Sequence, residues 1–204
     1  MNRSHANISV AALAVALIAV TPCAASADVV TFHGVGLHQR VKIHSAFRTQ
    51  HVHAGQLRAS YQGEDYDTYC VDLSQYAGSG EATETPVTAL HNGDLVGWLY
   101  EAQAGGVTDS LGAASLQVAI WELLYESDEN PFDVTSGAFY ITRNHRAAGG
   151  AQALLDAAPT SYVPARSTMT LTSSQKQDLL IPEPTMLCIL VGGIPLALRR
   201  RWRR

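Results

Sequence analysis

Cysteine is scarce in this sequence, and its placement argues against a fold held together by disulfides. Only three cysteines occur in 204 residues, whereas small disulfide-stapled domains carry an even and dense set. Cys23 lies beside an apolar run near the start of the chain, and Cys188 lies in an apolar run near its end. We expect both runs to be removed, which leaves Cys70 alone in an oxidising compartment without an intrachain partner.

Long apolar stretches are also missing, so no run is typical of a permanent membrane span. The runs at 8–20 and 186–198 are shorter than the ~20 residues that a spanning helix needs. Arg3 precedes the first run, Pro22 follows it, and small residues end at Ala27. This pattern predicts a secretory signal peptide over residues 1–27, cleaved after Ala27.

The C-terminal end has three parts in a fixed order. Pro182, Glu183 and Pro184 precede the apolar run, and an arginine cluster closes the chain. This order resembles the PEP-CTERM sorting signal, which would occupy residues 181–204 after a linker at 173–180. The resemblance implies a tail that is held transiently in the inner membrane and cut by an exosortase-type enzyme. The protein would then reach the cell surface or the extracellular space. An ordinary C-terminal membrane anchor is the alternative.

The remaining chain is acidic once both ends are set aside. Between residues 28 and 181 there are 8 Lys and Arg against 17 Asp and Glu, a net charge near −9. An acidic domain argues against a nucleic-acid partner. The arginine cluster of the tail is therefore not interpreted as a nucleic-acid patch, and contact with the membrane is expected only through that tail.

Hydrophobic periodicity predicts one α+β domain over residues 28–172. We expect an antiparallel β-barrel or sandwich with a small helical subdomain inserted between strands. A hairpin turn is predicted at 62–65, a loop at 74–85, and Cys70 near the end of a strand. The other expected strands lie at 29–32, 41–44, 56–61, 66–71, 138–141 and 167–172, and the expected helices at 95–104 (Asp94 as N-cap), 110–126 and 147–158.

Two short motifs carry the main chemical hypothesis. Residues 69–72 read Tyr-Cys-Val-Asp, and residues 117–121 follow about 45 positions later as Gln-Val-Ala-Ile-Trp. Together they resemble the thioester domains of bacterial surface adhesins, in which a cysteine attacks a glutamine carboxamide and ammonia leaves. One departure is Leu116, where those domains usually have Thr. The resemblance carries over at Cys70, Gln117, Ala119, Ile120 and Trp121.

The residues themselves suit this chemistry. A thioester is an activated acyl group that an amine or hydroxyl can attack, provided that its site excludes water. Gln117 on a helix could face Cys70 at a strand end, and Trp121, one turn further on, could cover the bond. Tyr69 is expected to shield the other side, and Asp72 to orient or protonate groups during exchange. The expected function is single-use attachment to a surface or matrix component, protein or exopolysaccharide, without turnover and without a cofactor.

Other interpretations remain open. Cys70 can be an inert buried thiol in a structural or extracellular-matrix surface protein of the same fold. A His-rich metal-binding module is a further alternative, although no HExxH or CxxC spacing supports it and no metal ligand set is assigned. Its five histidines are His33, His38, His44, His51 and His53. The acidic residues after Trp121, namely Glu122, Glu126, Asp128 and Glu129, are interpreted as a solvated helix end.

Overall fold

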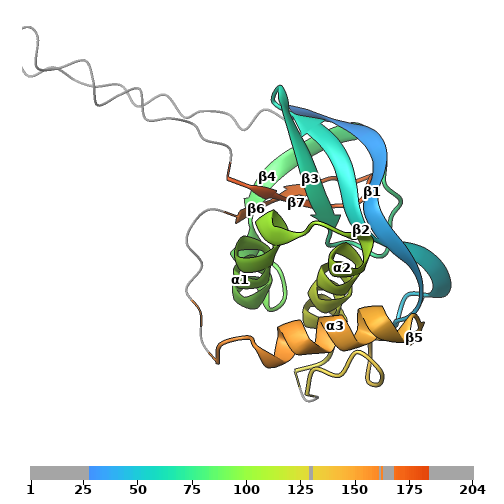
Figure 1. The fold of residues 1–204 in the computed structure, drawn as a ribbon. Helices are drawn as coiled ribbons and strands as arrows, with labels where there is room; N and C mark the ends of the chain where they lie inside the picture. Colours follow the sequence, from blue (N-terminus) through green and yellow to red (C-terminus); the bar gives the residue numbers. More distant parts are fainter. Residues whose placement is uncertain (1–27, 129–130, 161, 163–167, 184–204) are drawn as a thin grey trace, which may run out of the picture.

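Seven antiparallel strands and three α-helices make up the part of the chain that a computed structural model describes, residues 28–128, 131–160, 162 and 168–183 (Figure 1). The mixed α+β prediction is confirmed. The strands are β1 (Asp28–His44), β2 (Thr49–Tyr61), β3 (Glu64–Cys70), β4 (Gly80–Pro86), β5 (Tyr140–Arg143), β6 (Thr168–Thr172) and β7 (Leu179–Pro182). The helices are α1 (Gly93–Gln103), α2 (Ser110–Tyr125) and α3 (His145–Asp156), with 3₁₀ turns at Val87–Ala89 and Ala104–Gly106.

The sheet follows the order β2-β3-β7-β6-β4-β1-β5, and β1 pairs with β2 as well. The 17-residue strand β1 makes this possible because its register shifts twice, after Phe32 and after Val35. Its first residues pair with β4 and its last residues with β5. Such irregularities bend a strand and increase its twist, so β1 contributes to pairings at both of its ends.

Helix α2 is the central element of the hydrophobic core. It packs against β1, β2, α1 and α3, and Figure 1 shows it between the sheet and the other two helices. Its predicted start is confirmed, since α2 begins at Ser110, and Asp109 caps it by accepting a 2.7 Å bond from the Gly112 N–H. Every residue from Ala113 to Leu123 is buried. A helix packed on several sides has no solvent face to keep polar.

The predicted linker at 173–180 is wrong at its C-terminal end. Leu179 and Leu180 begin β7, which lies between β3 and β6 in the sheet. Leu180 and Ile181 are 0% and 1% exposed. The folded domain therefore extends past residue 172 to Pro182, inside the predicted sorting motif. A three-residue apolar run beside a proline is too short to separate from the tail by periodicity alone.

Several smaller expectations also need correction. Strand β4 occupies the second half of the predicted loop 74–85. Helix α1 begins after Asn92, whose backbone is in the left-handed conformation, and not after Asp94 as predicted. Among the described residues, no helix is long and apolar enough to cross a membrane. The predicted signal peptide and the tail from Pro184 onward lie outside the described residues.

Candidate functional site

Strand β3 ends at Cys70 with one of its two edges left open. On one side it pairs with β7, through Tyr69 opposite Leu180 and a 3.0 Å bond from the Val71 N–H to the Asp178 carbonyl. On the other side its ladder with β2 stops at Thr68. Main-chain groups of alternate residues point to opposite neighbours in an antiparallel sheet. The N–H and C=O of Cys70 therefore point toward β2, where no strand residue meets them.

The side chain of Gln117 fills that gap. Its Oε1 accepts a 3.0 Å hydrogen bond from the Cys70 N–H, and its Nε2 donates a 2.8 Å bond to the Cys70 carbonyl. Continuing the β2–β3 register would place Gly55 opposite Cys70. Gly55 instead pairs with His38 at φ +143°, and β2 follows β1 there. The carboxamide of Gln117, 1% exposed, thus replaces one rung of the sheet.

The thiol of Cys70 is buried and protonated. Its Sγ donates to the Asp72 carbonyl at 2.9 Å, and the residue is 3% exposed. Burial raises the pKa of this thiol to about 12, although the Asp72 main chain and the Trp121 indole act in the opposite direction. The thiolate is the reactive form of cysteine. Any reaction here must remove the proton while the new bond to sulfur forms.

Helix α2 holds the segment after β3 at a second point. Tyr125, eight residues after Gln117, donates a 2.9 Å bond to the Val71 carbonyl and accepts a 2.9 Å bond from the Leu73 N–H. Sequence analysis missed Tyr125. Its spacing of eight residues from Gln117 places both on one helix face and could have indicated it.

Trp121 lies in the core on the same side of α2 as Gln117. It is 2% exposed, its ring lies 6.3 Å from that of Phe139, and its indole N–H has no acceptor among the described residues. The indole interacts with the Cys70 thiol closely enough to affect its pKa. Trp121 therefore lies near the cysteine, and its role in covering a bond stays a prediction.

The other predicted support residues lie less directly at the site. Tyr69 points to the opposite face of β3 from Cys70 and packs edge-on against Tyr100, with ring centroids 6.2 Å apart. Asp72 meets the thiol through its main-chain carbonyl, because its carboxylate accepts bonds from Ser74 at 2.6 and 2.7 Å. Ala119 and Ile120 are fully buried in the core on α2.

The interpretation of a solvated end of α2 is wrong for two of its carboxylates. Glu122 is 0% and Glu126 3% exposed. Glu122 accepts a 2.7 Å bond from the Asp133 N–H, and Glu126 accepts bonds from the Ala138 and Phe139 N–H groups at 2.9 and 3.2 Å. Burial raises the pKa of Glu122 to about 8. Both carboxylates anchor the loop that brings Phe139 against Trp121, while Asp128 is exposed as expected.

The histidines do not form a metal centre. Among the described residues, no group of three His, Cys, Asp or Glu side chains is placed to hold a metal ion. His38 and His53 contact each other with ring centroids 4.6 Å apart, and His44 stacks on Tyr140 at 4.5 Å. His33 bonds to Ser60. The structure therefore gives no support to the metal-binding alternative.

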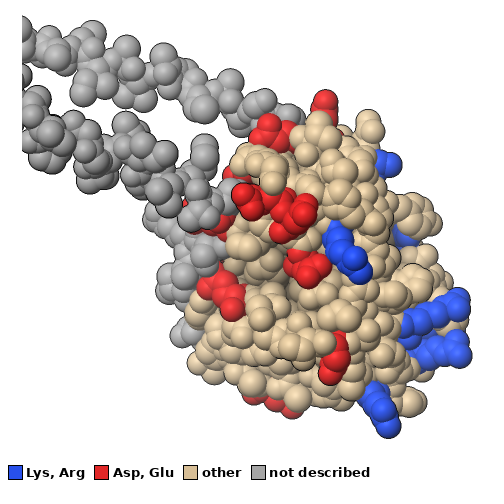
Figure 2. Space-filling view, turned by 45° about the horizontal axis from the view of Figure 1, so that its top comes forward, with Lys and Arg blue, Asp and Glu red and all other residues tan. Residues whose placement is uncertain are grey.

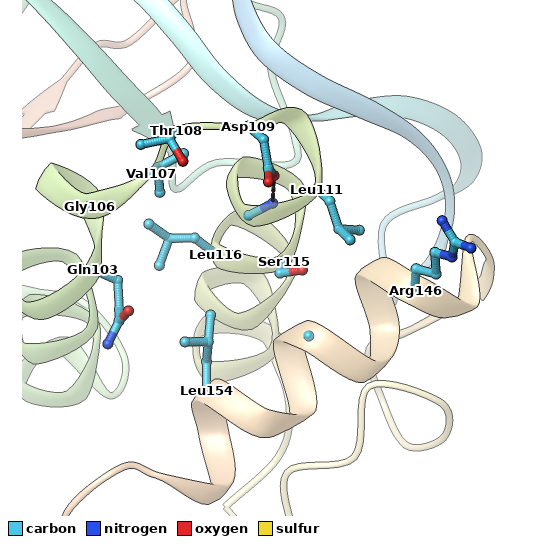
Figure 3. Close-up of a pocket in the computed structure, with 12 residues that line it drawn as sticks. Gln103, Gly106, Val107, Thr108, Asp109, Leu111, Ser115, Leu116, Arg146 and Leu154 are labelled. Atoms are coloured by element: carbon cyan, nitrogen blue, oxygen red, sulfur yellow. Dashed lines mark hydrogen bonds between the residues drawn. The ribbon is translucent and has the colours of Figure 1, made fainter.

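A separate pocket of about 410 Å³ opens between α2, α3 and the end of α1 (Figure 3). Its apolar lining includes Leu111, Leu116 and Leu154, with Arg146 at its margin. Leu116 is the residue that departs from the thioester-domain pattern. Neither Cys70 nor Gln117 lines this pocket, so it is not the site of the paired motifs.

Compared with models of protein families, with curated proteins and with solved structures, the chain matches none of them. The function is therefore inferred from the geometry of Cys70 and Gln117.

Proposed function

We propose that this protein is a secreted, surface-sorted domain that forms an internal thioester between Cys70 and Gln117. The thioester would attach the protein once, covalently, to an amine or hydroxyl on a surface or matrix component. The observation that carries the proposal is that both polar atoms of the Gln117 side chain are held at the main chain of Cys70. The finer fold inferred with it is a barrel-like sheet, closed by the β1–β2 pairing, with helices inserted between its strands.

Bond formation needs no external base or cofactor. The Cys70 Sγ joins the Cδ of Gln117, the Cδ–Nε2 bond breaks, and the thiol proton leaves with the nitrogen as ammonia. Negative charge develops on Oε1, which already faces the Cys70 N–H at 3.0 Å. A donor placed where charge develops stabilises the transition state. The loss of Nε2 removes the donor to the Cys70 carbonyl, at a cost of about 1–3 kcal/mol.

Attachment would release the thiol of Cys70 again. An amine attacks Cδ, the Cδ–Sγ bond breaks, and the proton of the amine restores the Cys70 thiol. The target is then joined to residue 117 by an amide, which does not revert, so each molecule acts once. Burial of Gln117 and Trp121 excludes the water that would otherwise hydrolyse the bond.

The geometry also supports a second function, that of a structural or matrix-associated surface protein with no bond. Two hydrogen bonds engage both the Oε1 and the Nε2 of Gln117 as a rung of the sheet. In addition, the high pKa of the Cys70 thiol favours an unreactive cysteine. In this alternative the pair serves only the stability of the fold.

Sorting is proposed from the C-terminal motif together with its place in the fold. Pro182 ends β7 and Glu183 follows it directly. An exosortase-type enzyme would have to cut beyond β7, since Leu180 and Ile181 belong to the core. The released domain would keep all seven strands and reside at the cell surface or outside the cell.

Amine capture distinguishes the two functions. The purified wild-type chain is incubated with a fluorescent alkylamine and then digested, and the peptide that contains Gln117 is examined. The thioester predicts label on residue 117 in the wild type and none in Cys70→Ala. An unlabelled wild type that retains both an intact Gln117 and a free thiol supports the structural alternative.

A further inference from the structure

The outer face of β1, β2 and β5 carries cations in register. Lys42 lies opposite His51 on β2 and opposite Arg143 on β5, and Arg40 lies opposite His53. Residues paired across antiparallel strands point to the same face of the sheet. We call these five residues the basic face. The alternate residues of β1, Val41 and Ile43, are fully buried on the other side.

This arrangement opposes the stability of the fold. Like charges directly opposite each other across strands are destabilising, and the only ion pair among the described residues joins His91 to Asp128. Desolvation and then the charges of Arg40, Arg143 and Lys42 lower the pKa of His51. The first turn of α3 adds His145 and Arg146 at its positive end, with no acidic residue there.

On the face that Figure 2 shows, the charge is unevenly distributed. The basic side chains lie in the right half of the view, and most of the acidic ones lie to their left. Two planar rings flank the basic face, since His44 pairs with Tyr140 across β1 and β5 and stacks on it with an interplanar angle of 2°. Cations beside stacked rings, on a solvent-exposed sheet face, suit an extended ligand that carries both carboxylates and ring surfaces.

We propose that the basic face is a docking surface for an acidic polysaccharide, a chain of sugar rings that carries carboxylates at intervals. Guanidinium groups bind carboxylates in a bidentate manner. Neighbouring strands are about 4.8 Å apart, and alternate residues along one strand are about 7 Å apart. Duplex DNA carries one charge per ~1.7 Å, much closer than the spacing of the cations on the basic face, so a chain with carboxylates at wider intervals matches this face better. The docking is non-covalent and does not require the thioester.

The test measures binding of polygalacturonate by the purified full chain in low salt. Neutral dextran, duplex DNA and poly-glutamate serve as comparison polymers. The informative variant is Lys42→Gln with Arg143→Gln. Its matched control is Arg58→Gln with Lys176→Gln, which removes the same charge outside the basic face. Both pairs are repeated in a Cys70→Ala background, so that failure of docking and failure of the thioester are distinguished.

We expect the wild type to bind polygalacturonate and to lose the polymer as salt rises. The Lys42→Gln, Arg143→Gln variant should bind about tenfold more weakly, and the control pair within about twofold of the wild type. Thermal melting should show the variant folded and no less stable than the wild type, since a repulsion is removed. The proposal would be overturned if both pairs of substitutions weakened polygalacturonate binding equally or if the wild type did not bind this polymer. Equal binding of DNA or poly-glutamate would also overturn it. So would self-association that the same variant abolishes, because it would assign the basic face to a second copy.

Discussion

The side-chain amide of Gln117 and the main chain of Cys70 form two hydrogen bonds, of 3.0 and 2.8 Å, at the position of an absent rung of the sheet. This relationship joins the central helix to the end of β3 inside the core. It places the carboxamide carbon in the immediate neighbourhood of a buried cysteine. The same contact can serve as a structural rung or as the ground state for thioester formation, and the predictions below separate these two roles.

Removing the amide should destabilise the fold even where no thioester can form. In a Cys70→Ala background, Gln117→Leu leaves the main-chain N–H and C=O of residue 70 buried without partners. Each unsatisfied group costs about 1–3 kcal/mol, so we expect a loss of about 2–5 kcal/mol in the free energy of unfolding. Urea denaturation of the two proteins measures it. A loss below about 0.5 kcal/mol would show that the pair does not support the sheet.

Gly55 lies where β2 turns away from Cys70, and it should tolerate no side chain. A Cβ there would lie 2.2 Å from the Leu37 carbonyl oxygen, and its φ of +143° strains any other residue. Gly34→Ala is the matched control, since Gly34 has φ +123° but nothing within 4 Å of its Cβ. We expect Gly55→Ala to cost several kcal/mol and Gly34→Ala about 1–2 kcal/mol. Equal melting temperatures for the two variants would contradict this role.

Glu122 should make stability fall as pH rises from about 4.5 to about 8. Its pKa is raised from 4.5 to about 8 by burial, with smaller contributions from the charges of Glu126 and Asp133. Within that window the folded state keeps a proton that the unfolded state has lost, so folding becomes less favourable with pH. Glu122→Gln removes this effect. Its stability relative to the wild type should increase from pH 5 to pH 8, and a constant difference between the two proteins would contradict the assignment.

Strand β7 should be required for folding although it borders the sorting motif. Leu180→Ala removes a side chain that is 0% exposed and should cost about 2–5 kcal/mol. Glu183→Ala, just beyond the strand, should change stability by less than about 0.5 kcal/mol. If both variants melt like the wild type, residues 179–182 do not belong to the folded core.

Sequence patterns predicted the elements that local chemistry specifies. Hydrophobic periodicity after residue 110 indicated α2, and the turn at 62–65 placed Cys70 near a strand end. The patterns did not show which main-chain groups would be left unpaired, because that depends on the turn of β2 at Gly55. Glu122 was misassigned for a similar reason. A carboxylate is expected in water until the fold provides it with buried N–H donors, and only the loop at 133–139 does so.

At the C-terminal end, the predicted domain boundary was wrong. The motif at Pro182 was strong enough to draw the predicted boundary too early, so that Leu179 and Leu180 were assigned to a linker. Their partners in β3 are far away in sequence, and such pairings have no local signal. Strand β4 was missed in the same way, since its pairing with β6 depends on residues more than eighty positions later.

The intact mass of the purified protein tests the central claim most directly. Wild type and Cys70→Ala are measured with the same processed ends, alongside thiol titration under denaturing conditions. The thioester predicts a wild-type mass lower than its sequence requires by one ammonia, no titratable thiol at Cys70, and full mass for Cys70→Ala. A bond that has formed and hydrolysed would leave Glu at position 117 with a free thiol, which peptide mapping detects. A wild type of full mass, with Gln at position 117 and a titrating Cys70, would contradict the account.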